Sequence, residues 1–223
     1  MTTYVLLQCS KSKTLPSQID LIWTKSVTIN DWSHSWKQST SKILVKDLYN
    51  GRTIKKALTF IESIKDISVY VISAGAGLVS LDTNIPSYDA SLITEEGPRK
   101  EDWFRLPHGG LEKINLVTGD TIVTFASPHY HRALLSDPSI SKLASKMVVA
   151  HTSPLSKLEG VTSIEIHPRT AEYLGVASID LNTELLKIYL SKGIEGLASI
   201  FHKSDELPLT PARSKISDSD LEN

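Results

Sequence analysis

Residues 68–73 read SVYVIS, and this run, with three others like it, decides the fold class of the 223-residue chain. The others are YVLLQ at 4–8, TIVTFA at 121–126 and MVVA at 147–150. All four are rich in apolar residues with little polar alternation, which is typical of strands covered on both faces of a parallel sheet. Residues 163–166 are expected to form a fifth strand at an edge.

Helical patterns lie between these runs and predict an α/β fold: a central four- to five-stranded, mostly parallel sheet with helices on both faces. The clearest amphipathic helix spans residues 181–192 and is expected to end at Gly193. A second spans 53–64, with apolar residues on one stripe and lysines opposite. Shorter helices are expected at 128–135 and 139–146, and a broken helical signal at 98–116.

Composition predicts one domain over residues 1–201, with a polar, tryptophan-containing insertion at about 25–41 and a mobile tail at 202–223. The counts of 24 Lys plus Arg and 25 Asp plus Glu show no bulk charge for nucleic acid, so a DNA partner would need a local basic patch. No apolar run approaches the ~20 residues of a membrane span, so we expect a cytoplasmic monomer without a membrane partner.

Cofactors and metals are not expected. Cys9 is the only cysteine, which excludes internal disulfides and cysteine-based zinc sites and fits a reducing compartment. His129 and His131 stand two residues apart, so on a helix they face different sides and make a poor metal pair.

Ligands of open α/β sheets bind beyond the carboxyl ends of the strands, so the loops that follow the strands are the candidate site. Lys11 and Lys13 follow the first strand and are either phosphate contacts or surface lysines of a solvated loop. Arg132, near the start of the helix after the third strand, is a further anion contact.

Two aspartates follow the second strand. Asp89 stands next to Tyr88, and a carboxylate beside a flat aromatic suits a pocket that stacks a base and faces a sugar. Asp82 is the other candidate carboxylate, although it also fits a turn cap. Trp32 and Trp36 in the insertion either read a base or pack the insertion onto the core.

His151-Thr152-Ser153-Pro154-Leu155-Ser156 resembles the second motif of the uracil-DNA glycosylases, with Thr152 as the departure. Residues 167–174 resemble the closing helix of that family. The resemblance implies that His151 stabilises the departing base, that Leu155 wedges into the duplex, and that Ser153 and Ser156 hold phosphates. The first motif of that family, Gly-Gln-Asp-Pro-Tyr-His, is replaced here by residues 8–11, QCSK.

A second resemblance, over roughly residues 4–175, is to the YaaA-like proteins and to phage-defence glycosylases that remove modified bases. It rests on the Cys-Ser loop at residue 9, on the ordered motifs 47–49, 72–78 and 85–89, and on 126–130. It implies a uracil-DNA-glycosylase-like fold and a base pocket formed by Cys9, Ser73, Gly75, Tyr88, Ser127 and Tyr130.

Together these features predict a DNA glycosylase that excises a modified, bulky base and leaves an abasic site, with phage DNA as its partner. Such a reaction builds positive charge on the sugar and negative charge on the base. Asp89, with Asp82 as the alternative, would face the sugar, and His151 would face the base. Two alternatives stay open: a YaaA-like DNA-binding stress protein without catalysis, and a hydrolase or deoxyribosyltransferase that acts on free nucleosides or nucleotides.

Overall fold

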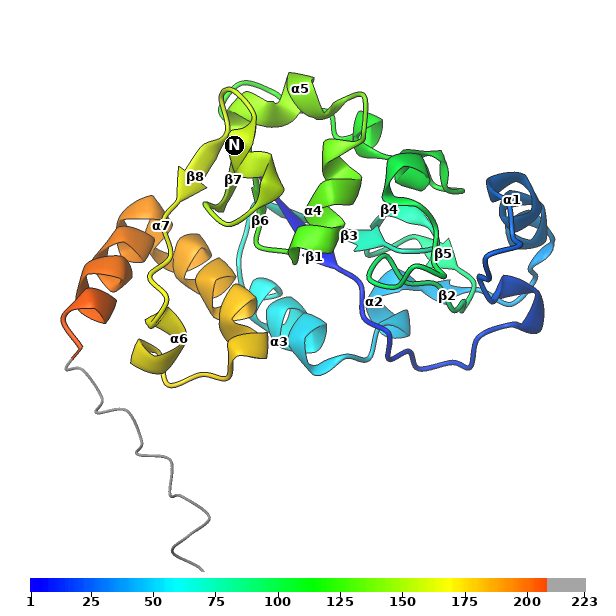
Figure 1. Ribbon diagram of the computed structural model, residues 1–223, viewed down its shortest axis with the longest axis horizontal. Helices are drawn as coiled ribbons and strands as arrows, with labels where there is room; N and C mark the ends of the chain where they lie inside the picture. Colours follow the sequence, from blue (N-terminus) through cyan, green and yellow to red (C-terminus); the bar gives the residue numbers. More distant parts are fainter. Residues whose placement is uncertain (208–223) are drawn as a thin grey trace, which may run out of the picture.

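The computed structural model describes residues 1–207, and a six-stranded sheet forms its centre (Figure 1). The order across the sheet is β4-β3-β1-β6-β7-β8. All neighbours pair in parallel except β4, which runs antiparallel beside β3. The strands are β1 Thr3–Gln8, β3 Ile67–Ser73, β4 Gly77–Ser80, β6 Thr121–Thr124, β7 Met147–Ala150 and β8 Thr162–Ile164.

The predicted α/β fold with a mostly parallel sheet is confirmed, and the expected number of strands is corrected from four or five to six. The missed strand is β4, which begins at Gly77. Gly77 has φ +93°, and a side chain there would collide with the carbonyl oxygen of Gly109. The backbone therefore turns back at Gly77 and pairs with β3 instead of continuing as a loop.

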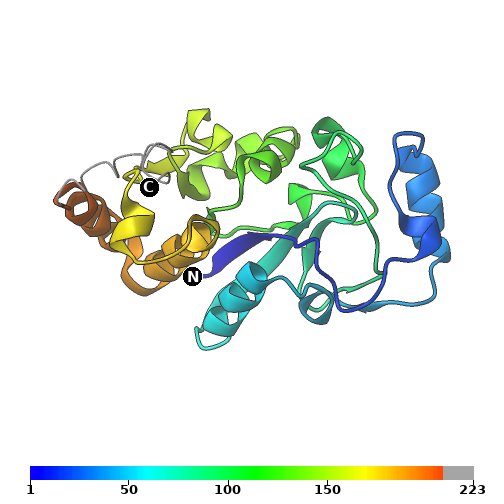
Figure 2. The ribbon, with the colours of Figure 1, turned by 60° about the horizontal axis from the view of Figure 1, so that its bottom comes forward.

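Alternating residues of β1 point into two different cores. Val5 pairs with Val69 and Val123 in the neighbouring strands and belongs to a cluster with α3 (Arg52–Ile61) and α7 (Leu181–Asp205). Leu6 points into the larger cluster on the other face, which includes residues of α4 (Pro128–Leu135) and α5 (Ile140–Leu143). Helices therefore cover both faces, and Figure 2 shows the layers from a second direction.

The remaining elements are short. A two-stranded sheet pairs β2 (Ile43–Leu44) with β5 (Asn84–Ile85). The region 98–116, where a broken helical signal is predicted, holds two 3₁₀ helices, η2 and η3, on either side of residues 107–110. The short helices are α2 Val45–Leu48, α6 Thr170–Tyr173, η1 Ile19–Leu21, η2 Lys100–Arg105, η3 Leu111–Lys113, η4 Ala144–Lys146, η5 Pro154–Lys157 and η6 Ser178–Asp180.

The helix α7 is interrupted where the sequence predicts. Gly193 has φ 65° and ψ −162°, which breaks the helix, and the chain then resumes helical structure up to Asp205. The predicted tail at 202–223 is therefore wrong in its first residues, because 202–205 are helical. The rest of the predicted tail from residue 208 lies outside the described residues.

The predicted insertion forms the helix α1 (Ile29–Gln38), which begins at a capping box between Thr28 and Asp31. Its two tryptophans are buried, and Trp32 donates its indole N–H to the carbonyl oxygen of Gly75 at 2.7 Å. The packing interpretation of Trp32 and Trp36 is thus confirmed, because neither ring is free to contact a base. Across residues 1–207, no helix has the length and apolar character needed to cross a membrane.

Candidate functional site

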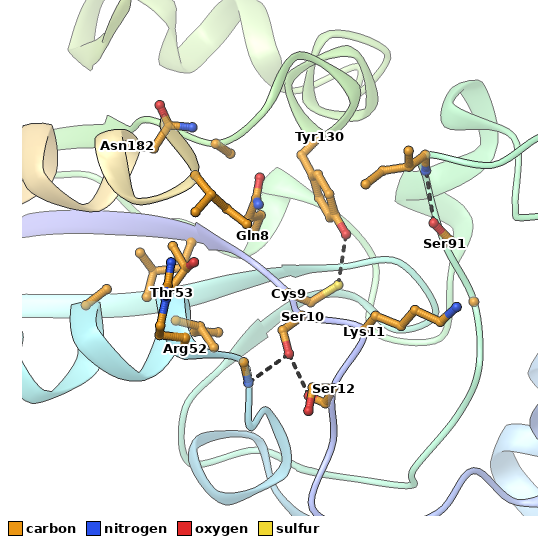
Figure 3. A pocket seen from close by; sticks show the side chains of 18 of the residues that line it. Gln8, Cys9, Ser10, Lys11, Ser12, Arg52, Thr53, Ser91, Tyr130 and Asn182 are labelled. Atoms are coloured by element: carbon orange, nitrogen blue, oxygen red, sulfur yellow. Dashed lines mark hydrogen bonds between the residues drawn. The ribbon is translucent and has the colours of Figure 1, made fainter. Parts of the chain in front are cut away.

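A cavity of about 720 Å³ opens at the carboxyl end of β1 (Figure 3). Within the sheet, β1 has β3 as its neighbour in one direction and β6 as its neighbour in the other. The chain adds β3 first and β6 later, so the strand order reverses between β1 and β6. Helices at such a switch point leave toward opposite faces, and the crevice between them is the usual ligand site of open α/β sheets. The volume falls within the range of roughly 300–1,000 Å³ that is typical of small-molecule sites.

Six segments of the chain line this cavity. They are residues 6–12 at the end of β1, Trp23, residues 51–57 at the start of α3, residues 89–97, the three residues Phe125, Ala126 and Tyr130, and residues 179–186 at the start of α7. Charged side chains of both signs reach it, with Lys11 and Arg52 opposed by Asp89 and Glu96. The cavity can therefore hold a ligand that has an anionic group for the cations and a positively charged or electron-poor group for the carboxylates.

The loop after β1 is held against the start of α3. The hydroxyl of Ser10 accepts the backbone N–H of Gly51 at 3.1 Å and donates to the carbonyl oxygen of Ser12 at 2.6 Å. A Cβ at Gly51 would lie 2.6 Å from the Cβ of Ser10, so a glycine is needed for this contact. From this fixed loop the side chain of Lys11 extends toward the segment that carries Ser91 (Figure 3).

Asp89 lines the cavity, as the sequence predicts. Its backbone is fixed by two hydrogen bonds of 2.7 Å, from its N–H to Leu21 and from the N–H of Trp23 to its carbonyl. Asp89 is exposed and is one of the lining residues of the cavity. Glu96 is a second carboxylate of the lining, which the sequence analysis missed because it lies far along the loop after β5, away from any strand end.

Asp82 does not belong to the site. It is exposed on the surface and forms an ion pair of 3.3 Å with Lys46, both side chains being well solvated. The antiparallel strand β4 carries the chain away from the carboxyl edge before Asp82 is reached. The expectation that Asp82 lies in the loop at the carboxyl end of the second predicted strand is therefore corrected, because the strand β4 intervenes.

Cys9 and Tyr130 line the cavity and contact each other, with 3.2 Å between the sulfur and the phenol oxygen. The sulfur also accepts the backbone N–H of Ala74 at 3.4 Å. Burial raises the pKa of the Tyr130 phenol well above its ordinary value, and the neighbouring Cys9 raises it further. Tyr130 therefore stays protonated and is a hydrogen-bond donor or acceptor at the cavity wall.

Tyr88, Ser73 and Gly75 lie beneath the cavity rather than at its surface. The phenol of Tyr88 bonds the hydroxyls of Ser73 at 2.7 Å and Tyr49 at 2.8 Å, and burial raises its pKa well above the ordinary value. A Cβ at Gly75 would lie 2.6 Å from the Tyr88 ring. The expectation that Tyr88 stacks on a base is corrected, because its ring is fully buried.

Lys13 covers the other side of this aromatic ring. Its ammonium lies 4.4 Å from the centroid of the Tyr88 ring, a cation–π contact. Burial lowers the pKa of Lys13, while the nearby Cys9 and Asp89 oppose that shift. Ser127, the last of the predicted pocket residues, donates its backbone N–H to the side chain of Gln8 at 2.8 Å and is not part of the lining.

The loop after β7 is closed by its own contacts. Ser153 is buried and its hydroxyl bonds Nδ1 of His131 at 2.7 Å, while Leu155 is fully buried in the core. The hydroxyl of Ser156 donates to the carbonyl oxygen of His151 at 2.9 Å. The predicted wedge role of Leu155 and phosphate role of Ser153 are corrected, because neither presents a free polar or apolar group at the surface.

His151 and Arg132 are exposed but do not line the cavity. Nδ1 of His151 accepts the backbone N–H of Ile166 at 3.1 Å. The shared edge of a parallel sheet predicts that His151 and Asp89 border one pocket, and this expectation is corrected. The reason is position across the sheet: β7 lies beyond β6, outside the switch point.

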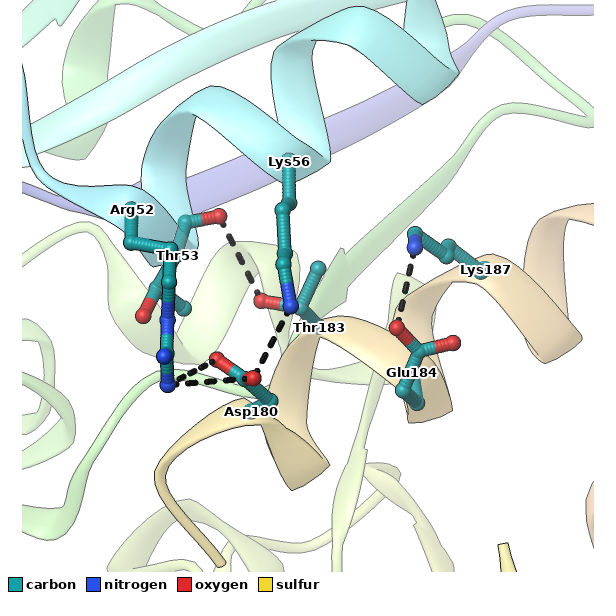
Figure 4. Close-up of polar contacts among 7 residues, drawn as sticks. All are labelled: Arg52, Thr53, Lys56, Asp180, Thr183, Glu184 and Lys187. Atoms are coloured by element: carbon teal, nitrogen blue, oxygen red, sulfur yellow. Dashed lines mark hydrogen bonds and ion pairs between the residues drawn. The ribbon is translucent and has the colours of Figure 1, made fainter. Parts of the chain in front are cut away.

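The wall opposite β1 comes from α7 and was not predicted as part of the site. Asp180, whose side chain is 8% exposed, accepts hydrogen bonds from Lys56 at 2.9 Å and Arg52 at 3.2 Å (Figure 4). These bonds lower the pKa of the carboxyl, with the one from Lys56 as the largest cause. They tie the start of α7 to α3, so that Asn182 and Thr183 face the cavity.

Residues 1–207 contain no group of three or more His, Cys, Asp or Glu side chains placed to hold a metal ion. His131 is instead a buried structural histidine, between Thr124 at 3.2 Å and Ser153, and burial lowers its pKa to about 4.

The fold and the cavity define an α/β protein whose candidate ligand site lies at the switch point of its sheet. The chain belongs to a family of unknown function (DUF6884), whose model matches residues 33–159, more than half of its length. The matched segment includes Asp89 and Tyr130, while the loop after β1 and the wall formed by α7 lie outside it. No curated protein and no solved structure matches the chain.

Proposed function

We propose that this protein is a DNA glycosylase that removes a modified, bulky base and leaves an abasic site, as a defence against phage DNA that carries such bases. The observation that carries the proposal is the cavity at the switch point, which Asp89 and Lys11 both line. A volume of about 720 Å³ leaves room for a base with a large substituent. A base must leave the stack to enter such a site.

In the proposed reaction a water molecule attacks C1′ of the sugar and the bond from C1′ to the base nitrogen breaks. The electron pair of that bond leaves with the base, and the water loses a proton to the carboxylate of Asp89. Asp89 also stabilises the positive charge that develops on the sugar. The departing base needs hydrogen-bond donors, and the side chains of Gln8 and Asn182 in the cavity are the candidates that replace His151.

Lys11 holds a backbone phosphate at the mouth of the cavity in this proposal. It is exposed, it projects from a loop fixed against α3, and positive charge near a phosphate strengthens DNA binding independently of sequence. The first turn of α3 also lines the cavity, and its backbone N–H groups favour an anion there.

The test compares three substrates: phage DNA with modified bases, the same sequence without modification, and the corresponding free nucleosides. Released base and alkali-labile sites are measured for each. Base release from modified DNA alone is expected. Binding of DNA without any release would favour a DNA-binding protein, and release from nucleosides alone would favour a nucleoside hydrolase or deoxyribosyltransferase; either result would overturn the proposal.

A further inference from the structure

A second cavity, of about 500 Å³, adjoins the first. Trp23 and Gly97 line both cavities, so the two form neighbouring compartments with the Trp23 ring at their boundary. The second cavity lies between the start of α1 and residues 95–105. Its walls therefore come from segments that contribute little to the first.

Trp23 is rigidly held at this boundary. Its backbone N–H donates to the carbonyl oxygen of Asp89 at 2.7 Å, and its ring contacts the buried ring of Trp32 at an angle of 54°, with 4.9 Å between the centroids. The ring is only partly buried, so it still presents surface to the cavities. A partly exposed indole that is fixed from behind is a platform on which a flat ring can stack.

The lining of the second cavity also carries oriented positive charge. Arg99 and Arg105 both pair with Asp102, at 2.6 Å and 2.9 Å, and the two arginine side chains remain more than half exposed. The lining also includes Lys25 and Glu95, so three cations face two carboxylates. The Asp102 carboxylate orients the two guanidinium groups while leaving several of their N–H donors free for an anion.

We propose that this second cavity binds the nucleotide next to the target nucleotide in the same DNA strand. Its base stacks on Trp23 and its phosphate meets Arg99, Arg105 and Lys25. The assignment rests on the proposed function, because a strand whose target base occupies the first cavity must continue past the boundary formed by Trp23. A stacking ring and cations that line one cavity fit a nucleotide of any sequence.

The test measures the affinity of single-stranded oligothymidylates, from one to six nucleotides long, by fluorescence anisotropy over a range of salt concentrations. Affinity is expected to rise when the chain lengthens beyond one nucleotide. Arg105→Gln should reduce the slope of log affinity against log salt by about one, because one phosphate contact is lost. This variant keeps the pair between Arg99 and Asp102.

Lys65→Gln is the matched control, since it also removes one exposed positive charge. Lys65 lies just before the amino end of β3, whereas the cavities lie at the carboxyl ends of the strands. This control variant should leave the slope unchanged. Trp23→Leu should lower the affinity for the longer oligonucleotides roughly ten-fold, and Trp23→Phe should retain most of it, because a ring is kept.

Several results would overturn the inference: no binding of oligothymidylates, no gain with length, or equal slopes for the wild type, Arg105→Gln and Lys65→Gln. Failure of the proposed function gives a different pattern. In that case modified phage DNA would lose no base, while the length dependence and the effects of Arg105→Gln and Trp23→Leu on oligothymidylate binding would remain.

Discussion

Two loops leave the same edge of the sheet but differ in what they contact. The loop after β1, residues 9–12, opens into the cavity, whereas the loop after β7, residues 151–156, closes on itself and on the core. The closed loop carries the string that most resembles a known motif. The open loop carries a short polar sequence without a familiar pattern, yet it stands at the switch point, where neighbouring helices diverge. Position in the sheet therefore decides which loop can bind a ligand.

The largest expected effect is on the rate of base release, which should depend on the cavity beside the open loop and not on the closed loop. Asp89→Asn should slow base release from modified phage DNA by roughly 10²–10⁴-fold, because it removes the carboxylate that accepts the proton of the attacking water. Asp82→Asn makes the same chemical change on the surface and should stay within about three-fold of the wild-type rate, and so should His151→Ala. Single-turnover kinetics, with a melting curve for each variant, measure this. A slow His151→Ala with a normal Asp89→Asn would reverse the comparison.

The free energy of unfolding should depend on the closed loop and hardly at all on the open loop. Leu155→Ala in the closed loop is expected to lower the free energy of unfolding by about 2–5 kcal/mol, because it leaves a cavity in the core. Lys11→Ala in the open loop should change it by less than about 0.5 kcal/mol. Denaturant unfolding gives both values. A stable Leu155→Ala protein that no longer binds DNA would restore the wedge interpretation.

The closed loop should also make the fold sensitive to acid through His131. An unfolded histidine binds a proton below about pH 6.5, whereas burial holds the pKa of His131 at about 4 in the folded protein. Between these values the unfolded state binds more protons, so stability falls as the pH falls, by on the order of 3 kcal/mol in total. His131→Asn should flatten this fall. A fall in His131→Asn as large as that in the wild type would contradict the assignment.

Salt dependence gives a smaller effect. Lys11→Ala should weaken DNA binding about equally for different sequences and reduce the slope of log affinity against log salt by about one. Ser156→Ala, in the closed loop, should leave the slope unaltered, since its hydroxyl already donates within the loop. Titrations at several salt concentrations test this. An unchanged slope in Lys11→Ala would make Lys11 an ordinary surface lysine.

The smallest expected effect is that of a chelator. Base release should be the same with and without EDTA, because the chain has one cysteine and its histidines lack the spacing of a ligand set. The assay is base release after dialysis against EDTA, with and without added zinc or magnesium. Activity that disappears and is restored by either metal would show that a ligand set has been overlooked.

The sequence by itself determined the parallel strands, the helix break at Gly193 and the presence of Asp89 at the cavity. These features follow from local causes: runs of apolar residues pair as buried strands, and glycine alone readily adopts a positive φ. Five strands were thus predictable, and so was the edge of the sheet at which ligands would bind.

The tertiary structure decided which side chains meet at that edge. The antiparallel strand β4 places Asp82 away from the cavity, and the loop that contains Leu155 packs into the core. The cavity is lined instead by Trp23 and by Asn182 of α7, which are 159 positions apart in the sequence. No local pattern encodes such meetings, because a resemblance of a few residues carries no information on what covers them. Burial and strand order, which arise only when the whole chain packs, separate a site residue from a core residue.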